Sequence, residues 1–231
     1  MHFFPDSLAA ALSLVVSLDR EMLAIVGVSL RVSLASVLLA GIAGVPLGFL
    51  VAFGEWPGKR LTVTLLNTLL ALPTVVIGLF VYSFLSRRGL FGPLNLLYTQ
   101  TAIVIGQILL VTPLIAALTM AAVSRIDDRY RLTAMTLGAD RLQTALVVLR
   151  EARFGIGAAV IAAFGRVIAE IGISMMLGGN IKGFTRTMTT AMALEYDKGA
   201  FTLAVALGIV LMAISFAVNL LFHFLQGRLR A

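Results

Sequence analysis

The chain has no cysteine and only two histidines, His2 and His223, which lie near opposite ends of its 231 residues. The absence of cysteine excludes disulfide bonds and thiolate chemistry. Two histidines so far apart argue against a histidine-based zinc or haem site within one chain. We therefore expect the chain itself to bind no metal or cofactor.

Charged residues are also scarce, at 13% of the chain, whereas 60% of the residues are hydrophobic. A soluble domain carries about 25% charged residues, because its whole surface faces water. Lipid removes that requirement, so the composition predicts an integral membrane protein. The formal net charge of +7 comes from Lys and Arg residues between long apolar runs and at the C-terminus. This distribution is typical of membrane topology and lacks the basic stripe of a nucleic-acid-binding protein.

Motifs of the common hydrolases are missing as well. The chain has no phosphate-binding loop of the form Gly-x-x-x-x-Gly-Lys-Ser/Thr, no His-Glu-x-x-His and no Gly-x-Ser-x-Gly. Ser29, Ser33 and Ser36 lie in the first apolar run, with no histidine near them in the sequence. A nucleophile without a base argues against a membrane-embedded hydrolase, so we expect a chain that is not an enzyme.

Five apolar runs are long enough to cross a bilayer, which takes about 20 residues. They cover residues 22–53, 61–85, 99–123, 154–178 and 200–226. In the preceding segment 1–20, the apolar part from Leu8 to Leu18 is too short to span. An interfacial helix is the favoured interpretation there, and a partly inserted helix is the alternative. The sequence thus predicts one all-α membrane domain over residues 1–231.

Glycine and proline interrupt these runs. The first run has a cluster of such residues at Gly41, Gly44, Pro46 and Gly48. The cluster predicts a kink, tilt or break, and its small residues at helical spacing favour close contact with another helix. Pro73 and Pro113 predict kinks or hinges in the second and third runs.

Positive charge sets the expected orientation. Segment 124–153 holds six arginines, and such a concentration places a short connection in the cytoplasm. With five spans, segment 54–60 and the C-terminal tail fall on the same side. That side then holds ten of the eighteen Lys and Arg residues, against six on the outer side. Arg87 and Arg88, both on the outer side, run against this bias.

The segment from Asp127 to Leu149 has the spacing of two short helices, separated by Leu137-Gly138-Ala139-Asp140. Gly138 can adopt the positive φ that ends a helix, and Asp140 can cap the next one. A helix–turn–helix module is therefore expected at the membrane surface between the third and fourth spans. Spacing alone also allows an amphipathic loop without any partner.

The stretch from Tyr130 to Asp140 resembles the cytoplasmic coupling motif of ABC importer permeases. The family pattern is Glu-Ala-Ala, three residues and Gly, with Ile-x-Leu-Pro further on, and this chain keeps Ala134, Gly138 and Ala139. Leu132 and Thr133 replace the Glu and Ala, and Arg150-Glu151 stands in place of the proline. The resemblance implies that a separate ATPase docks on Tyr130, Arg131, Thr133, Ala134, Leu137, Gly138, Ala139 and Asp140.

Residues 164–199 resemble the tungstate-uptake branch of these permeases. Molybdate and sulfate permeases are similar through the element Gly179-Asn180 but diverge in the following Thr-Arg-Thr-Met-Thr-Thr stretch, residues 185–190. The similarity extends to Leu72-Pro73-Thr74 and Asp197-Lys198-Gly199, and so covers nearly the whole chain. It implies an ABC importer permease fold of type I-like architecture, with about five spans, an N-terminal interfacial helix and a cytoplasmic coupling helix.

Two charged residues, Arg166 and Glu170, lie one helical turn apart near the middle of the fourth run. Ionised groups at such a depth must pair or face water or protein. They either line or gate an anion path or form a structural ion pair. The structural interpretation is favoured at this stage, because Glu170 would largely cancel the field that Arg166 offers to an anion.

The segment Gly178–Thr190, at the outer end of the same run, is rich in hydrogen-bond donors. A dianionic tetrahedral oxyanion needs several convergent N–H and O–H donors and little negative charge. On this chemistry and the resemblance, we assign to the substrate path or to binding-protein docking Gly178, Gly179, Asn180, Thr185, Arg186, Thr187 and Thr190. A turn with surface threonines is the alternative.

The resemblance implies a complete transport machine in the cell inner (plasma) membrane. Two copies of the chain would form the pore, each with a partner ATPase that binds ATP and Mg, and an extracytoplasmic binding protein would deliver tungstate. The alternatives are a molybdate or sulfate permease of the same design, an ATP-independent channel or secondary transporter, and a membrane scaffold.

Overall fold

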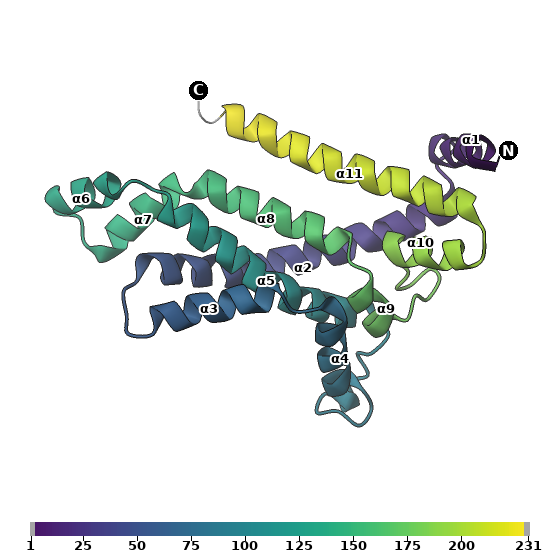
Figure 1. Ribbon diagram of the computed structural model, residues 1–231, viewed down its shortest axis with the longest axis horizontal. Helices are drawn as coiled ribbons and strands as arrows, with labels where there is room; N and C mark the ends of the chain where they lie inside the picture. The colour runs from purple at the N-terminus through teal and green to yellow at the C-terminus, as the bar shows by residue number, and fades with distance from the viewer. Residues whose placement is uncertain (1–2, 229–231) are drawn as a thin grey trace.

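The computed structural model describes residues 3–228, and every regular element in that range is helical (Figure 1). His2 and the last three residues of the C-terminal tail lie outside it. The elements are α1 (Phe3–Val16), α2 (Arg20–Phe53), α3 (Lys59–Leu70), α4 (Thr74–Leu85), η1 (Gly92–Leu94), α5 (Gln100–Ser124), α6 (Asp128–Thr136), α7 (Arg141–Glu151), α8 (Arg153–Ile168), α9 (Gly172–Gly178), α10 (Met188–Asp197) and α11 (Phe201–Arg228).

The five predicted runs appear as three long helices and two bent pairs. In the described part of the chain, α2, α5 and α11 are each long and apolar enough to cross a membrane. The second run is divided into α3 and α4, which meet at 96°, and the fourth into α8 and α9, which meet at 60°. Pro73 stands at the first break, as its lack of an N–H predicts. The second break, at Glu170, was not predicted.

The first run does not break. Helix α2 continues through Gly41, Gly44 and Gly48 with Pro46 inside it, and α5 likewise continues through Pro113. The predicted close contact is present at two of the glycines. A Cβ at Gly44 would lie 2.9 Å from Ile115 Cβ, and one at Gly48 would lie 2.2 Å from the carbonyl oxygen of Ala116. Glycine thus lets α2 and α5 approach closely, whereas the space around Gly41 is open.

Helices α2 and α5 form the centre of the bundle, and a polar contact joins them in their apolar core. The hydroxyl of Ser36 lies 2.8 Å from Gln107 Oε1, and both side chains are buried. A buried amide needs such a partner, because an unsatisfied one costs about 1–3 kcal/mol. Around this contact, Val37, Ala40, Val111 and Ile115 pack with α8 residues in the main apolar cluster.

The two ends of the bundle differ. Helices α6 and α7 project from one end of the long axis, beside the turn between α2 and α3, and α11 runs back toward that end (Figure 1). Helices α9, α10 and α1 lie at the opposite end, where α1 packs against α11. Segments 54–60 and 124–153 therefore share one end, as the five-span topology requires. Which end faces the cytoplasm stays a prediction.

Candidate functional site

The turn between α6 and α7 has the geometry that its sequence predicts. Gly138 has φ +85°, its N–H donates to the carbonyl of Met135, and the N–H of Ala139 donates to that of Ala134. These two bonds form a Schellman cap. Asp140 then starts α7 through a capping box with Gln143. Helices α6 and α7 are thereby held as a hairpin with a fixed angle.

The hairpin presents apolar side chains on its outer surface. Leu137, at the turn, is 81% exposed and Leu142 is 70% exposed. The other exposed large apolar residues of the hairpin are Tyr130, Leu132, Met135, Leu146 and Val147. A hollow of about 520 Å³ lies among Tyr130, Thr133, Ala134, Leu137 and Val147 and the polar residues Asp127 and Arg129. Such an apolar surface outside a lipid-facing segment is typical of a protein-binding site.

The inner surface of the hairpin is anchored to the end of α2. The guanidinium of Arg131 lies 5.2 Å from the ring centroid of Phe53, a cation–π contact. Val148 packs with Val123 and Ala152 in a cluster that also includes Phe49 and Phe53. The hairpin therefore contacts the ends of both α2 and α5.

The turn between α2 and α3 is fixed beside this anchor. Lys59 Nζ donates to the carbonyls of Ala52 (3.2 Å) and Gly54 (3.0 Å), and it lies 2.8 Å from Glu55 Oε1. The hydrogen bond and the charge of Lys59 lower the pKa of Glu55. Lys59 thus satisfies carbonyls at the end of α2 that the helix leaves unpaired.

The pair Arg166–Glu170 is present at the break between α8 and α9. Arg166 Nη1 lies 2.8 Å from Glu170 Oε2, and Glu170 Oε1 accepts a bond of 3.3 Å from the N–H of Ile173, at the start of α9. The carbonyl of Glu170 accepts from the hydroxyl of Thr189 in α10 at 2.8 Å. Glu170 therefore links three helices.

The threonines of the outer segment bond within the protein. The Thr185 hydroxyl donates to the carbonyl of Gly178 at 2.5 Å, and Thr187 and Thr190 form the capping box of α10. Gly179 ends α9 with φ +68°, and Asn180 donates to the carbonyl of Thr190 at 3.3 Å. These contacts give the threonine hydroxyls structural partners, so they are not left free for an anion.

Arg186 is held in the same segment. Its Nη2 lies 3.5 Å from the carbonyl of Asn180 and its Nη1 lies 3.9 Å from Glu21, which also pairs with Lys182 at 2.6 Å. The exposed residues at the tip of the segment are Ile181, Lys182, Gly183 and Phe184. The geometry thus favours a docking surface over an anion cradle here.

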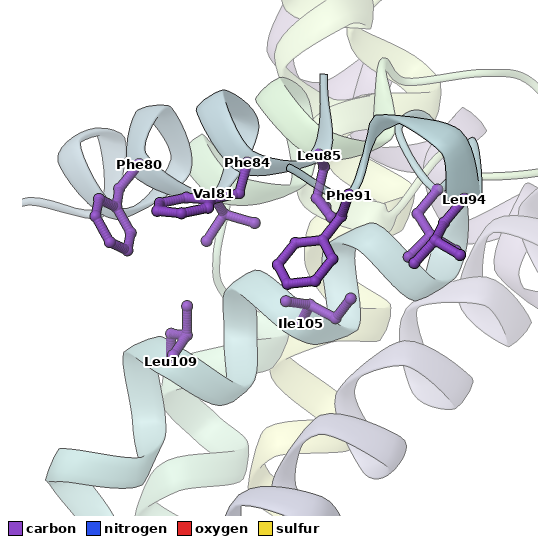
Figure 2. A pocket seen from close by; sticks show the side chains of 9 residues that line it. Phe80, Val81, Phe84, Leu85, Phe91, Leu94, Ile105 and Leu109 are labelled. Atoms are coloured by element: carbon purple, nitrogen blue, oxygen red, sulfur yellow. The ribbon is translucent and has the colours of Figure 1, made fainter. Parts of the chain in front are cut away.

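A cavity of about 430 Å³ lies between α4 and α5 (Figure 2). Figure 2 shows the rings of Phe80, Phe84 and Phe91 facing Ile105 and Leu109. The remaining lining residues are Val81, Leu85, Leu94 and Leu96. This lining is wholly apolar and offers no donor to an anion, so the cavity is not the substrate site.

The comparison with known families agrees with this architecture. A model of the family described as binding-protein-dependent transport system inner membrane component matches residues 44–231. The chain belongs to this family of ABC importer permeases.

The permease is similar to two tungstate uptake system permease proteins named TupB. It is 38% identical to that of Peptoclostridium acidaminophilum over 98% of this chain and 99% of the relative. It is 36% identical to that of Campylobacter jejuni over 98% and 95%. Among solved structures, the chain matches a bacterial alginate ABC transporter in complex with an alginate pentasaccharide-bound periplasmic protein. The TM-score is 0.74 at 16% identity, and the match covers 91% of this chain and 80% of that one. This last likeness supports the fold alone.

Some structural residues of the permease were missed at the sequence level. Ser29 Oγ accepts from the N–H of Met188 at 2.7 Å and so attaches α10 to α2. Glu21 and Gln107 likewise act across long sequence separations. The spacing of Ser29, Ser33 and Ser36 on one helix face was a usable signal, because buried hydroxyls on one face indicate polar contacts between helices.

Proposed function

We propose that this chain is the membrane-spanning subunit of an ATP-driven importer that carries tungstate or a closely related oxyanion through a homodimeric pore. The observation that carries the proposal is the α6–α7 hairpin. It projects from one end of the bundle, presents an exposed apolar surface, and is fixed to α2 through Arg131 and Phe53.

A partner ATPase fits this surface. The hairpin holds its angle through the Gly138 cap and the Asp140 capping box, so a force at Leu137 moves the hairpin as one body. The contacts with Phe53 and Val123 then transmit that movement to the central helices. ATP and Mg belong to the partner in this scheme, and the permease has a mechanical role.

The orientation follows from charge. The hairpin end carries the arginine-rich segment 124–153, and such segments are retained in the cytoplasm. The opposite end, with Ile181 and Phe184 exposed, then faces outward and provides the docking surface for an extracytoplasmic binding protein. The inner (plasma) membrane is the expected location.

A second copy accounts for apolar surface that one copy leaves exposed. Helix α11 presents Met212, Phe216, Leu221 and Phe224, and α4 presents Leu79 and Phe80. Lipid covers part of such a surface, and a two-fold-related copy covers the rest, the symmetry that is commonest among homo-oligomers of soluble proteins.

The substrate is inferred from chemistry and from the relatives. Two relatives that match 98% of this chain are named for tungstate uptake. Tungstate, molybdate and sulfate share charge and tetrahedral shape, so the binding protein must contribute much of the discrimination. Calorimetric titration of the cognate binding protein separates them: we expect tight tungstate binding, whereas tight sulfate binding without tungstate binding would contradict the substrate assignment.

Reconstitution tests the transport mechanism. We expect tungstate uptake into proteoliposomes only when the permease, its ATPase, the loaded binding protein and ATP are all present. Leu137→Asp should lower binding-protein-stimulated ATP hydrolysis and uptake together, and Leu137→Met, which keeps the apolar surface, should preserve both. Uptake by the permease alone under an ion gradient would contradict the proposal and favour a secondary transporter.

A further inference from the structure

Glu170 is a buried carboxylate at a break in a membrane helix. Its side chain is 3% exposed, and both of its carboxylate oxygens have partners, Arg166 on α8 and the N–H of Ile173 on α9. Its carbonyl is bonded to Thr189. Because every one of these bonds is internal, Glu170 is fixed and serves to hold its partners in place.

Arg166 differs from Glu170 in its exposure. Its side chain is 43% exposed, and within residues 3–228 the bond to Glu170 is its one hydrogen bond to a protein acceptor. A guanidinium carries five N–H donors in a planar fork. Most of these donors are therefore free, and they are held at a defined place by the fixed carboxylate.

The exposed face of α8 does not resemble a lipid-facing surface. From residue 158 to the C-cap of α8, the exposed positions follow helical spacing at Ala158, Ala162, Arg166 and Ala169. The exposed face of α11 instead carries large apolar residues such as Met212 and Phe216. An arginine among alanines at membrane depth must face protein or water, because lipid would leave its charge unsolvated.

Further donors lie on the other side of Glu170. A Cβ added to Gly172 would lie 3.4 Å from Glu170 Oε1 and 3.0 Å from the hydroxyl oxygen of Thr74. The Thr74 hydroxyl and the Glu170 carboxylate therefore both lie close to the same glycine. Thr74 begins α4, whose first turn has no side-chain cap. The breaks in the second and fourth runs are thus adjacent in space, and the positive end of the α4 dipole lies beside the ion pair.

We propose that Arg166 is the side chain that contacts the oxyanion inside the bilayer, with Glu170 as the positioning residue that presents it. This inference rests on the proposed function and assigns a substrate contact within it. The ligand class is a tetrahedral dianion, whose oxygens match the guanidinium fork in the bidentate manner of carboxylates and phosphates.

The paired carboxylate suits transport better than an isolated arginine would. An unpaired guanidinium at this depth would be costly and would hold a dianion strongly. Transport needs binding that is favourable enough for the ion to enter and weak enough for it to leave. Glu170 neutralises Arg166 between cycles and weakens the hold on the anion, so the cancellation of charge is part of the function.

The test uses the full permease reconstituted with its ATPase and binding protein, and tungstate as the probe. In the double variant Arg166→Gln/Glu170→Gln, two amides replace the ion pair and can keep a hydrogen bond. We expect it to elute as folded protein and to keep stimulated ATP hydrolysis within about two-fold. Uptake should fall about ten-fold or more, the loss that one charge-assisted hydrogen bond accounts for. Arg166→Lys, which keeps the charge without the fork, should lose several-fold.

Two further variants complete the test. Glu170→Gln leaves Arg166 unneutralised, so we expect this variant to retain tungstate after gel filtration, measured by elemental analysis, when the double variant retains none. Arg20→Gln removes an exposed arginine at the outer end of α2 and should leave uptake unchanged.

The outcomes separate this inference from the proposed function. Normal uptake by the double variant would overturn the inference, and so would normal uptake by Arg166→Lys if the double variant fails to fold. Equal losses of uptake and ATP hydrolysis would also overturn it, because they indicate a purely structural pair. Absence of uptake by the unsubstituted permease with all its partners would overturn the proposed function itself.

Discussion

Replacing Gly48 by alanine tests the close contact between α2 and α5, the central pair of the bundle. The new Cβ would lie 2.2 Å from the carbonyl oxygen of Ala116 and 2.8 Å from Thr119 Cβ. A carbon–oxygen contact normally measures about 3.3 Å or more, so the two helices must separate by roughly 1 Å. Overpacking of this kind costs about 1–3 kcal/mol.

Gly41→Ala is the matched control, since it lies on the same helix in open space. Both variants gain up to about 1 kcal/mol of helix propensity, so the difference between them isolates the contact. At about 2 kcal/mol, that difference lowers the midpoint of thermal unfolding by roughly 4–8 °C for a chain of this size. The measurement is a thermal scan in detergent. A midpoint for Gly48→Ala equal to or above that of Gly41→Ala would refute the reasoning.

Three further predictions concern local structure. Gly138 has φ +85° in open space, so Gly138→Val should strain only the backbone, by about 1–2 kcal/mol, and should weaken stimulated ATP hydrolysis. Asparagine tolerates this conformation, so Gly138→Asn should weaken the hydrolysis less. Equal hydrolysis by the two variants would contradict this prediction. Ser36→Ala should lower the unfolding midpoint more than Ser36→Ala/Gln107→Leu does, because the single change leaves a buried amide unpaired; the opposite order would refute that account. Asp140→Ala removes a capping box and should destabilise α7 by about 1 kcal/mol, seen as faster amide hydrogen exchange there; unchanged exchange would count against the cap.

Features that depend on neighbours in the sequence could be predicted. The turn at Gly138 and the cap at Asp140 are set by a few residues each, and both are present. The pair Arg166–Glu170 follows from helical spacing and is also present. Pro73 marks the break between α3 and α4 for the equally local reason that it lacks an N–H.

Features that depend on tertiary contacts could not be predicted from the sequence. The break after α8 lies within an apolar run, at Glu170, whose carboxylate and carbonyl bond to Ile173 and Thr189 on other helices. The threonine-rich segment was assigned to the substrate path or to binding-protein docking, and nothing in the sequence indicated that Thr187 and Thr190 form the capping box of α10. Pro113 does not divide α5, which continues through it and packs against α2.

On the proposed function, the α6–α7 hairpin faces the cytoplasm and receives the ATPase. Since the chain has no cysteine, any maleimide labelling of a single-cysteine variant reports on the introduced cysteine alone. The two variants are Leu137→Cys, at the exposed turn, and Ile181→Cys, at the opposite end. Each is treated with a membrane-impermeant maleimide in inside-out vesicles, with and without the ATPase. We predict labelling at position 137 only, and its protection when the ATPase is bound. Labelling at position 181 alone would contradict the account.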